Sequence, residues 1–400
     1  MSGERGRGAW TSAWAAIALY VLAAILTPAV AANEADSRQQ TEAALEGAGD
    51  VIEDWTSLSL NLTGTEWFGT GLLTGEGKSV TIIGSGGVAP VEGLPPGLER
   101  FRPRHMVWAR IGLDGPVFNL AGDQYTFAAD RTGELYIAVP PFGNYWATRD
   151  GTFADYAAAL PPIPLDMHLT AVQWAGDPAA GLKALTRQED DAFDLALEAL
   201  QTTPRLPEGF EYLWYLGQSR VFDTLSVGEH HGIRGAVAND FGIIRKAVDI
   251  PLDSSAEISF DWLYSALPAE GPETDTAHHD YLSIAVEFDN GQDITWFWSR
   301  ELEPEQTFRC PLFWWDQRET HIVLQSGTEG LGEWQSHKRN ILADYMKAVG
   351  GEAPARIVGV WLIGVSIAGQ TPGEAAFANA KINSTAGELY IFKGDGTNDD

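Results

Sequence analysis

The fold of the N-terminal half is decided by Leu135-Tyr-Ile-Ala-Val-Pro-Pro-Phe-Gly-Asn-Tyr-Trp-Ala-Thr-Arg-Asp-Gly-Thr-Phe153. The apolar and aromatic residues Leu135–Val139 predict a β-strand. An irregular polar loop with proline, glycine and asparagine follows, and Phe153 marks the return to the core. We therefore expect a strand that ends in a long loop at the edge of a β-domain. Loops on a rigid scaffold often carry binding residues.

Further strand patterns surround this stretch, separated by glycine-rich turns such as Gly84–Gly87 and Arg131–Gly133. They are Ser79–Ile83, Met106–Ile111, Gln124–Phe127 and Leu169–Trp174. Short strands with frequent turns are typical of a sandwich or barrel. We expect one β-sandwich over residues 60–175.

A helical connector is expected next, over residues 176–209. Asp177 is a good N-cap residue, and Pro178 is suited to the first helical position. Apolar residues then recur at roughly helical spacing until Thr203-Pro204 and Pro207-Glu-Gly209. We expect this element to pack between two domains.

The second domain, residues 210–393, returns to β-structure with one helix predicted over Ser336–Gly350. Its predicted strands are Glu257–Trp262, Tyr281–Phe288, Ile294–Trp298, His321–Leu324, Ile357–Val365 and Glu374–Ile382. The predicted fold is mainly β: two antiparallel β-sandwiches, the first galactose-binding-like and the second jelly-roll-like, joined by a helical connector.

The N-terminus has the features of a secretory signal peptide over residues 1–32. Arg5 and Arg7 precede an apolar run, and small residues surround Ala29-Val-Ala31. The alternative is an uncleaved membrane anchor, although the apolar run is marginal for a span. We expect an exported protein, periplasmic or extracellular, with no membrane span after cleavage. Residues 33–59 would be a polar lead-in with a short helix around Thr41–Trp55, and residues 394–400 a disordered tail.

The composition restricts the partners. The formal net charge is -29, and Lys and Arg are few and scattered, so we expect an acidic protein that does not bind nucleic acid. Cys310 is the single cysteine, which rules out an internal disulfide. Its apolar neighbourhood favours a buried inert thiol over a nucleophile.

The first domain resembles the bacterial galactophilic lectins of the PA-I type and their galactose-binding-like relatives, over about residues 60–175. The matching residues are Trp67, Gly71, Gly75, Val107–Gly112, Phe118, Phe127, Gly133–Ile137 and Gly151–Phe153. In that family, an aspartate at a strand end and paired asparagines in the following loop bind calcium, whose open positions take sugar hydroxyls. The resemblance implies a non-catalytic, carbohydrate-binding protein.

The calcium ligands of that family are not kept. The aspartate aligns with Pro141 and the asparagines with Thr148 and Arg149. Calcium needs about six to eight oxygen ligands, so calcium is disfavoured and no cofactor is expected. The loop could still bind sugar without metal, through Asn144, Tyr145, Trp146, Arg149 and Asp150. The alternative is a structural loop with Trp146 tucked over the sandwich end.

The second domain is similar to domain-of-unknown-function family 3047. The matching residues are Phe260–Trp262, Asp280–Phe288, Gly332–Trp334, Lys338–Asn340, Asp344-Tyr345, Gly359-Val360 and Ala376–Ile382. Pro207–Phe210 and Leu213–Gly217 match a connector that often precedes this domain. The family's polar turn is replaced by Ser366–Thr371. Its activity is not established, so the resemblance implies a fold rather than a reaction.

Histidine pairs in the second domain suggest a metal site. One residue of His230-His231 and one of His278-His279 could join Asp280 around an ion. Adjacent histidines in a strand point to opposite faces, so a single pair cannot chelate one ion. The alternative, which we favour, is exposed loop histidines; we assign no metal site.

Two other groups are ligand-binding candidates. Arg339, Asn340 and Asp344 on the predicted helix would either dock it on the sheet, which we favour, or orient a ligand. Trp296 and Trp298 share one face of a strand. Core packing is the default explanation for these rings, but Phe297 on the other face suggests that one face lines a sugar groove or an inter-domain contact.

Three functions remain open. The leading one is non-catalytic binding of a glycan or another cell-envelope component. The second is a polysaccharide-acting glycoside hydrolase or lyase that uses a carboxylate pair drawn from Asp261, Asp280, Glu287 or Asp316. The third is a structural or assembly protein of the envelope. The sequence leaves the oligomeric state open.

Overall fold

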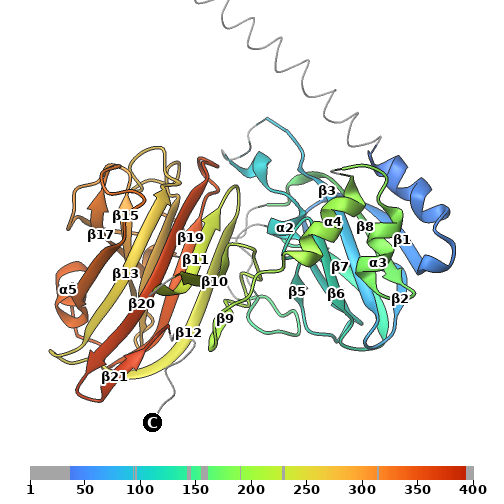
Figure 1. The fold of residues 1–400 in the computed structure, drawn as a ribbon. Coiled ribbons are helices and arrows are strands. Elements are labelled where there is room, and N and C mark those ends of the chain that lie inside the picture. The colour runs from blue at the N-terminus through green and yellow to red at the C-terminus, as the bar shows by residue number, and fades with distance from the viewer. Residues whose placement is uncertain are drawn as a thin grey trace, which may run out of the picture.

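The computed structural model describes residues 37–392 except 93, 95–96, 142–145, 155–160, 190, 228–229 and 313–314. Its strands form four sheets that make up two β-domains, seen as two lobes in Figure 1. Paired strands run antiparallel, apart from β15 (Asp293–Ser299) and β17 (Glu319–Ser326), which pair in parallel. The prediction of a mainly β protein with antiparallel β-sandwich domains is confirmed. The expected signal peptide and C-terminal tail lie outside the described residues.

The first domain encloses its core between two four-stranded sheets. One sheet has the order β1 (Ile52–Leu62), β8 (Pro164–Trp174), β3 (Ser79–Val88), β6 (Gln124–Ala128). The other has the order β2 (Gly64–Thr74), β7 (Gly133–Val139), β4 (Trp108–Ile111), β5 (Phe118–Asn119). Short helical turns are η1 (Gly49–Val51), η2 (Leu98–Arg100) and α2 (Pro103–Met106). Residues 37–46 are helical, and β1 begins inside the segment expected as a polar lead-in.

The second domain has two larger sheets. The six-stranded sheet has the order β10 (Phe222–Val227), β11 (His230–Val237), β20 (Gly373–Ser384), β13 (Glu257–Ala266), β18 (Gln335–Asn340), with β21 (Gly387–Tyr390) on β20. The seven-stranded sheet has the order β16 (Thr307–Arg309), β17, β15, β14 (Tyr281–Phe288), β19 (Arg356–Val365), β12 (Phe241–Pro251), β9 (Phe210–Tyr212). A short turn, η3 (Trp315–Gln317), precedes β17.

The two sheets of the second domain are buried differently. In β13 every second side chain faces the core, the pattern of a sheet with one solvated face. In β14 and β15 nearly every residue is buried, so both faces of the seven-stranded sheet are covered. Trp296 packs into the main core, whereas Phe297 packs into a second cluster on the outer face. Aromatic side chains therefore lie on both faces of β15 because each face of the sheet packs into a core of its own.

The connector helices are α3 (Pro178–Leu185) and α4 (Ala192–Gln201). As predicted, the Asp177 side chain caps α3 by accepting a hydrogen bond from the Ala180 amide. Both helices lie on the outer face of the β1-β8-β3-β6 sheet (Figure 1), where Leu182 and Phe193 pack around Trp174. The expectation that the connector packs between the domains holds only at the end of α4, where the Arg220 guanidinium donates to the carbonyl oxygens of Ala199 and Thr202. The apolar stripe of the connector covers a sheet face of the first domain instead.

The helix predicted over Ser336–Gly350 is shorter. Gln335–Asn340 pairs with β13 as β18, and the helix α5 spans Ile341–Ala348. Asn340 caps it, because its side chain accepts a hydrogen bond from the Ala343 amide. Within the described residues, none of the helices has the length and apolar character needed to cross a membrane.

Candidate functional site

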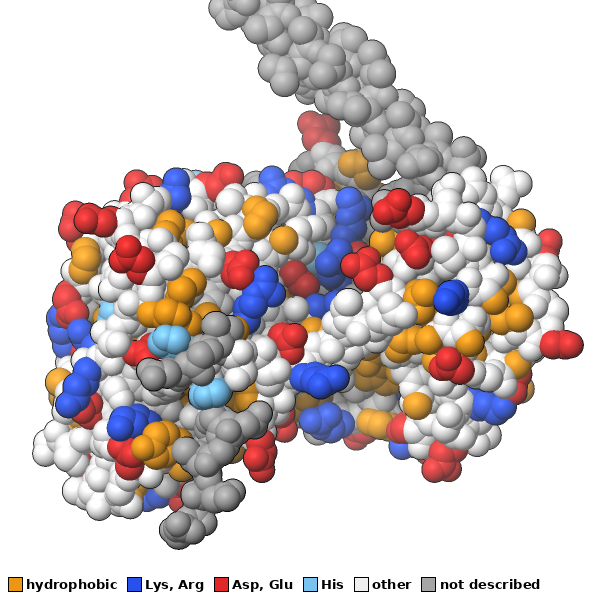
Figure 2. Space-filling model, viewed as in Figure 1, with side chains coloured by type: hydrophobic (Ala, Val, Ile, Leu, Met, Phe, Trp, Pro, Cys, Tyr) orange, Lys and Arg blue, Asp and Glu red, His pale blue; other side chains and the backbone are white. Residues whose placement is uncertain are grey.

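A cavity of about 570 Å³ lies where the two domains meet. The first domain contributes Leu98, Phe101, Met106 and Trp108 to its wall. The outer face of the seven-stranded sheet and its covering loops contribute Phe241, Ile243, Trp315 and Ile363. Figure 2 shows Lys and Arg side chains gathered along the junction of the two lobes on the face in view. The cavity itself is walled mainly by apolar and aromatic side chains.

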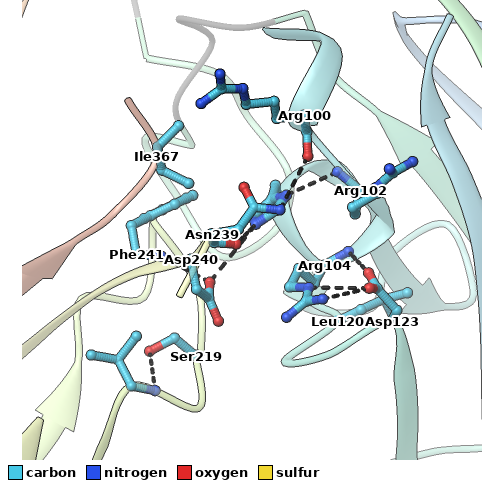
Figure 3. A network of polar contacts seen from close by, with 12 residues as sticks. Arg100, Arg102, Arg104, Leu120, Asp123, Ser219, Asn239, Asp240, Phe241 and Ile367 are labelled. Carbon is cyan, nitrogen blue, oxygen red and sulfur yellow. Dashed lines mark hydrogen bonds and ion pairs between the residues drawn. The ribbon is translucent and has the colours of Figure 1, made fainter. Parts of the chain in front are cut away.

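Polar contacts hold the two domains together beside the cavity (Figure 3). The ring of His105 in α2 bonds the Asn239 carbonyl oxygen through Nε2, at 2.9 Å. The Arg100 guanidinium donates to the Ala368 carbonyl oxygen at 2.6 Å. Asn119 donates to the Gln218 carbonyl oxygen at 2.8 Å and accepts from the Gln218 amide at 2.6 Å. These hydrogen bonds fix the position of the first-domain wall of the cavity relative to the second-domain wall.

Four buried side chains gather at one end of the cavity: His279, Cys310, Glu319 and His321. One donor atom from each lies within 4.8 Å of the other three. Glu319 and His321 are two positions apart on β17 and point to the same face. Cys310 follows β16, which pairs with β17, and His279 comes just before β14. His279 and Glu319 reach the cavity wall.

Short contacts link these four residues. Cys310 Sγ lies 3.3 Å from His279 Nε2, and His321 Nε2 lies 3.5 Å from Glu319 Oε1. Glu319 Oε1 also accepts hydrogen bonds from the Tyr281 hydroxyl at 3.0 Å and the Thr295 hydroxyl at 3.2 Å. Thiol, imidazole and carboxylate are the side chains that bind transition metals in proteins.

Burial shapes the protonation of this cluster. It lowers the pKa of His279 to about 3, with the neighbouring His321 adding to the effect, so the His279 ring is neutral at pH 7. Burial pushes the pKa of Glu319 upward, but its contacts with His321, His279 and Cys310 together outweigh burial and lower that pKa to about 2. Burial, followed by the Glu319 charge, raises the pKa of the Cys310 thiol.

Cys310 and His279 have the separation of a thiol–imidazole dyad, but the setting does not suit a nucleophile. The Cys310 side chain is 1% exposed and is absent from the cavity wall. A reactive thiol needs a lowered pKa and access to substrate, and this one has neither. The prediction of a buried thiol is confirmed.

Asp280, a predicted ligand-binding residue, binds backbone amides of a neighbouring loop. Its carboxylate accepts hydrogen bonds from the amides of Ile367, Ala368 and Gly369, at 2.8, 2.9 and 2.6 Å. Burial raises its pKa, and these bonds oppose the rise. The side chain thereby fixes the loop after β19 that forms part of the cavity wall. Its oxygens are used by the backbone, which does not suit a catalytic carboxylate.

Two other carboxylates considered for hydrolysis, Glu287 and Asp261, are engaged in contacts of their own. Glu287 is bound to Arg245 at 2.9 Å and to Arg318 at 3.1 Å. Asp261 accepts hydrogen bonds from Ser336 and Asn379 on neighbouring strands.

Of the predicted sugar-binding residues that the structure describes in this loop, Trp146, Arg149 and Asp150 are not part of the cavity wall, whereas the preceding Pro141 is. Trp146 is 3% exposed and stacks on Phe153, with ring centroids 4.1 Å apart. This is the tucked arrangement stated above as the alternative. Arg149 lies over the Trp214 ring at 5.2 Å, and the Asp150 side chain accepts from the Thr152 amide and hydroxyl. Asn144 and Tyr145 lie outside the described residues.

The predicted residues near α5 form a separate group. The Arg339 guanidinium binds the Asp344 carboxylate at 2.6 Å, and Asp344 also accepts from the buried indole of Trp296. These contacts fit the docking role favoured from the sequence. Trp298 is 1% exposed and donates to the Gly327 carbonyl oxygen. Neither tryptophan offers a ring face to solvent.

The histidine pairs are not brought together. His230 stacks on Trp334 with centroids 3.8 Å apart, and the His231 Nδ1 atom lies 3.1 Å from the Ser226 hydroxyl. His278 lies beside Asp275. Of the four histidines, His279 joins the buried cluster, and its companions come from elsewhere in the chain.

Sequence reasoning missed Glu319 and His321. A usable signal was present, because Glu319-Thr-His321 places two metal-binding side chain types two positions apart in a predicted β-region. Cys310 was recognised as buried but not as a partner of this pair.

Comparison with known protein families gives a match to part of the chain. Residues 217–381 match a protein family described as "Protein of unknown function (DUF3047)". This supports the resemblance stated for the second domain, whereas the lectin resemblance of the first domain rests on the residues quoted for it. No curated protein matches the chain.

Among solved structures, the chain is similar to the xyloglucanase domain of NopAA, a type three effector from Sinorhizobium fredii, in complex with cellobiose. That match has 10% identity, 45% coverage of this chain, 95% of that chain and a TM-score of 0.28. A mutant of the ENZbleach xylanase matches with 9% identity, 45% and 81% coverage and a TM-score of 0.24. Both scores are too low to bear on the function of this chain.

Proposed function

We propose that this protein is an exported, non-catalytic binding protein. Its ligand is an amphipathic cell-envelope component, such as a glycan that carries an apolar group, held in the cavity between the two domains. The observation that carries the proposal is the cavity itself. Its volume of about 570 Å³ is in the range of small-molecule sites, roughly 300–1,000 Å³.

The lining favours an amphipathic ligand over a bare sugar. Aromatic and aliphatic side chains from both domains form most of the wall, and they gain free energy by covering apolar ligand surface. The polar side chain of Thr276 lies on the second-domain side of the wall and would orient a polar head.

A binding role is favoured over catalysis because two of the candidate carboxylates, Asp280 and Glu287, are already engaged. Asp280 is bonded to three backbone amides, and Glu287 to two arginines. The export part of the proposal rests on the signal-peptide pattern of residues 1–32 and is checked by cell fractionation.

Titration with an apolar fluorescent probe tests the proposal. We expect one probe molecule to bind per chain and a glycolipid to displace it, while the matching free oligosaccharide does so far less well. Ile367→Trp would fill part of the cavity and weaken probe binding on the order of tenfold. The control Leu73→Trp adds the same ring on the exposed surface of β2 and should bind as the wild type does.

Two outcomes would contradict the proposal. Unchanged probe binding by Ile367→Trp would place the probe elsewhere on the protein. Equal displacement by the oligosaccharide and the glycolipid would show that the apolar walls take no part in recognition.

A further inference from the structure

The donor atoms of His279, Cys310, Glu319 and His321 have the spacing of a tetrahedral metal site. Bonds of about 2.0–2.3 Å to a central ion put tetrahedral donors about 3.3–3.6 Å apart. Cys310 Sγ and His279 Nε2 are separated by 3.3 Å, and His321 Nε2 and Glu319 Oε1 by 3.5 Å. The remaining separations stay within 4.8 Å, so small rotations of the side chains would close the set around one ion.

His321 supplies an independent sign of a missing partner. Its side chain is fully buried, and neither ring nitrogen has a hydrogen-bond partner among the described residues. Buried polar atoms in proteins are nearly always hydrogen-bonded, so such an atom needs an explanation. A metal bond to Nε2 would satisfy the nitrogen that faces Glu319.

The charges of the cluster also balance around a divalent ion. A thiolate at Cys310 and a carboxylate at Glu319 give two negative charges, and two neutral imidazoles add none. A divalent cation therefore makes the buried group neutral overall. Burying an uncompensated charge is costly, and a neutral metal centre avoids that cost.

The next layer of residues holds the ligands in position. His279 Nδ1 lies 2.6 Å from the Glu273 carbonyl oxygen, which can only accept. Nδ1 therefore carries the proton, and in the neutral ring Nε2 presents its lone pair toward Cys310. The Tyr281 and Thr295 hydroxyls both donate to Glu319 Oε1. Outer hydrogen bonds of this kind fix the tautomer and orientation of metal ligands.

The geometry points to one divalent transition-metal ion, of the zinc or copper class, bound by His279, Cys310, Glu319 and His321. Soft thiolate and imidazole donors select such ions over calcium or magnesium. On binding, the Cys310 S–H bond breaks, the sulfur keeps the electron pair and bonds the metal, and the proton leaves to solvent.

This ion would have a structural role. Four protein ligands complete a tetrahedron, the arrangement of closed structural sites. The ion would join β17 to the segments before β14 and after β16, beside the cavity wall to which His279 and Glu319 contribute. It would do so in a chain whose single cysteine cannot form an internal disulfide. The site does not depend on the proposed ligand, because no ligand atom is needed to complete it.

Metal analysis of the full chain, purified with a tag that contains no histidine, tests the site. We expect one zinc or copper ion per chain after equilibration with either metal. Cobalt substitution should give a thiolate charge-transfer band and the visible bands of a tetrahedral ion. A chelator should lower the unfolding midpoint of the wild-type protein, and added metal should restore it.

Substitution of two of the four ligands tests the site further. Cys310→Ala and His321→Ala should bind metal at least about tenfold more weakly and lose the charge-transfer band. His278→Gln is the matched control, since this neighbouring, partly exposed histidine lies outside the cluster and should leave metal content unchanged. Wild-type protein that takes up none of the three metals would overturn the site, even if the variants fail to fold. Metal content unaffected by Cys310→Ala in folded protein would overturn it equally.

Discussion

Asp344 Oδ2 accepts a hydrogen bond of 2.9 Å from Nε1 of Trp296, and this contact joins α5 to β15 of the seven-stranded sheet. The indole is fully buried on β15, and the Asp344 side chain is 8% exposed. The same carboxylate binds the Arg339 guanidinium at 2.6 Å. One side chain therefore satisfies a buried donor and a largely buried charge at once.

Asp344→Ala should lower the free energy of unfolding by about 3 kcal/mol, because it leaves the Trp296 N–H and the Arg339 charge without this partner. Urea unfolding monitored by tryptophan fluorescence measures the change. Glu352→Ala, at an exposed position just after α5, is the control and should stay within about 0.5 kcal/mol of the wild type. An equal effect of the two substitutions would refute the docking role of Asp344.

Gly181 lets helix α3 approach the sheet of the first domain. A Cβ atom at this position would lie 2.3 Å from the Trp174 ring. Gly181→Ala should therefore destabilise the first domain by about 1–3 kcal/mol, despite the better helix propensity of alanine. Gly176→Ala is the matched control, since its Cβ would meet nothing within 4 Å. Thermal unfolding of the two variants measures the change in stability. A Gly181→Ala variant as stable as the wild type would show that α3 can move away from Trp174.

Asn119 links the two domains through both atoms of its side-chain amide. Replacement by alanine removes the bonds to the Gln218 carbonyl and amide, and should cost about 1–3 kcal/mol. We also expect faster proteolysis of the native protein within residues 202–210, because the domains separate more often. Asn61→Ala, at an exposed position of β1, should be cleaved at the wild-type rate. Equal cleavage rates for both variants would argue against this link.

The pair of His105 and Asp240 at the domain junction should make stability depend on pH. Burial raises the pKa of Asp240 to about 6, opposed by Arg104, so Asp240 stabilises the fold increasingly as the pH falls through 6. Burial lowers the pKa of His105 to about 4, with Arg104 adding to the effect, so His105 removes stability as the pH falls from 6.5. Asp123 and Arg220 also face Asp240 and contribute smaller effects. The two main effects largely cancel in the wild type.

Asp240→Asn should remove the stabilisation that protonation of Asp240 provides at lower pH, and leave the opposing effect of His105. The unfolding free energy of the variant, relative to the wild type, should fall by about 2 kcal/mol between about pH 7 and about pH 4. Urea unfolding at these two pH values measures the difference. A difference between variant and wild type that does not change with pH would show that Asp240 titrates normally.

Part of this structure was predictable because local physical chemistry dominates it. Tyr281–Phe288 was expected as a strand and forms β14 with the same ends, since a short run of buried apolar residues suits a central strand. Asp177 caps α3 for the reason stated from the sequence. The error in the helix over Ser336–Gly350 arose because Gln335–Asn340 pairs with β13, a long-range contact that overrides helical spacing.

The sequence by itself determined the β-class, the burial of Cys310 and the surplus of negative charge. These properties depend on composition and on patterns that repeat over a few residues. Only the tertiary structure decided that His279, Cys310, Glu319 and His321 meet, and that a cavity lies between the domains. The parallel pairing of β15 with β17 and the addition of β16 set the position of the cluster. Strand order follows from packing across the whole sheet, and no local pattern encodes it.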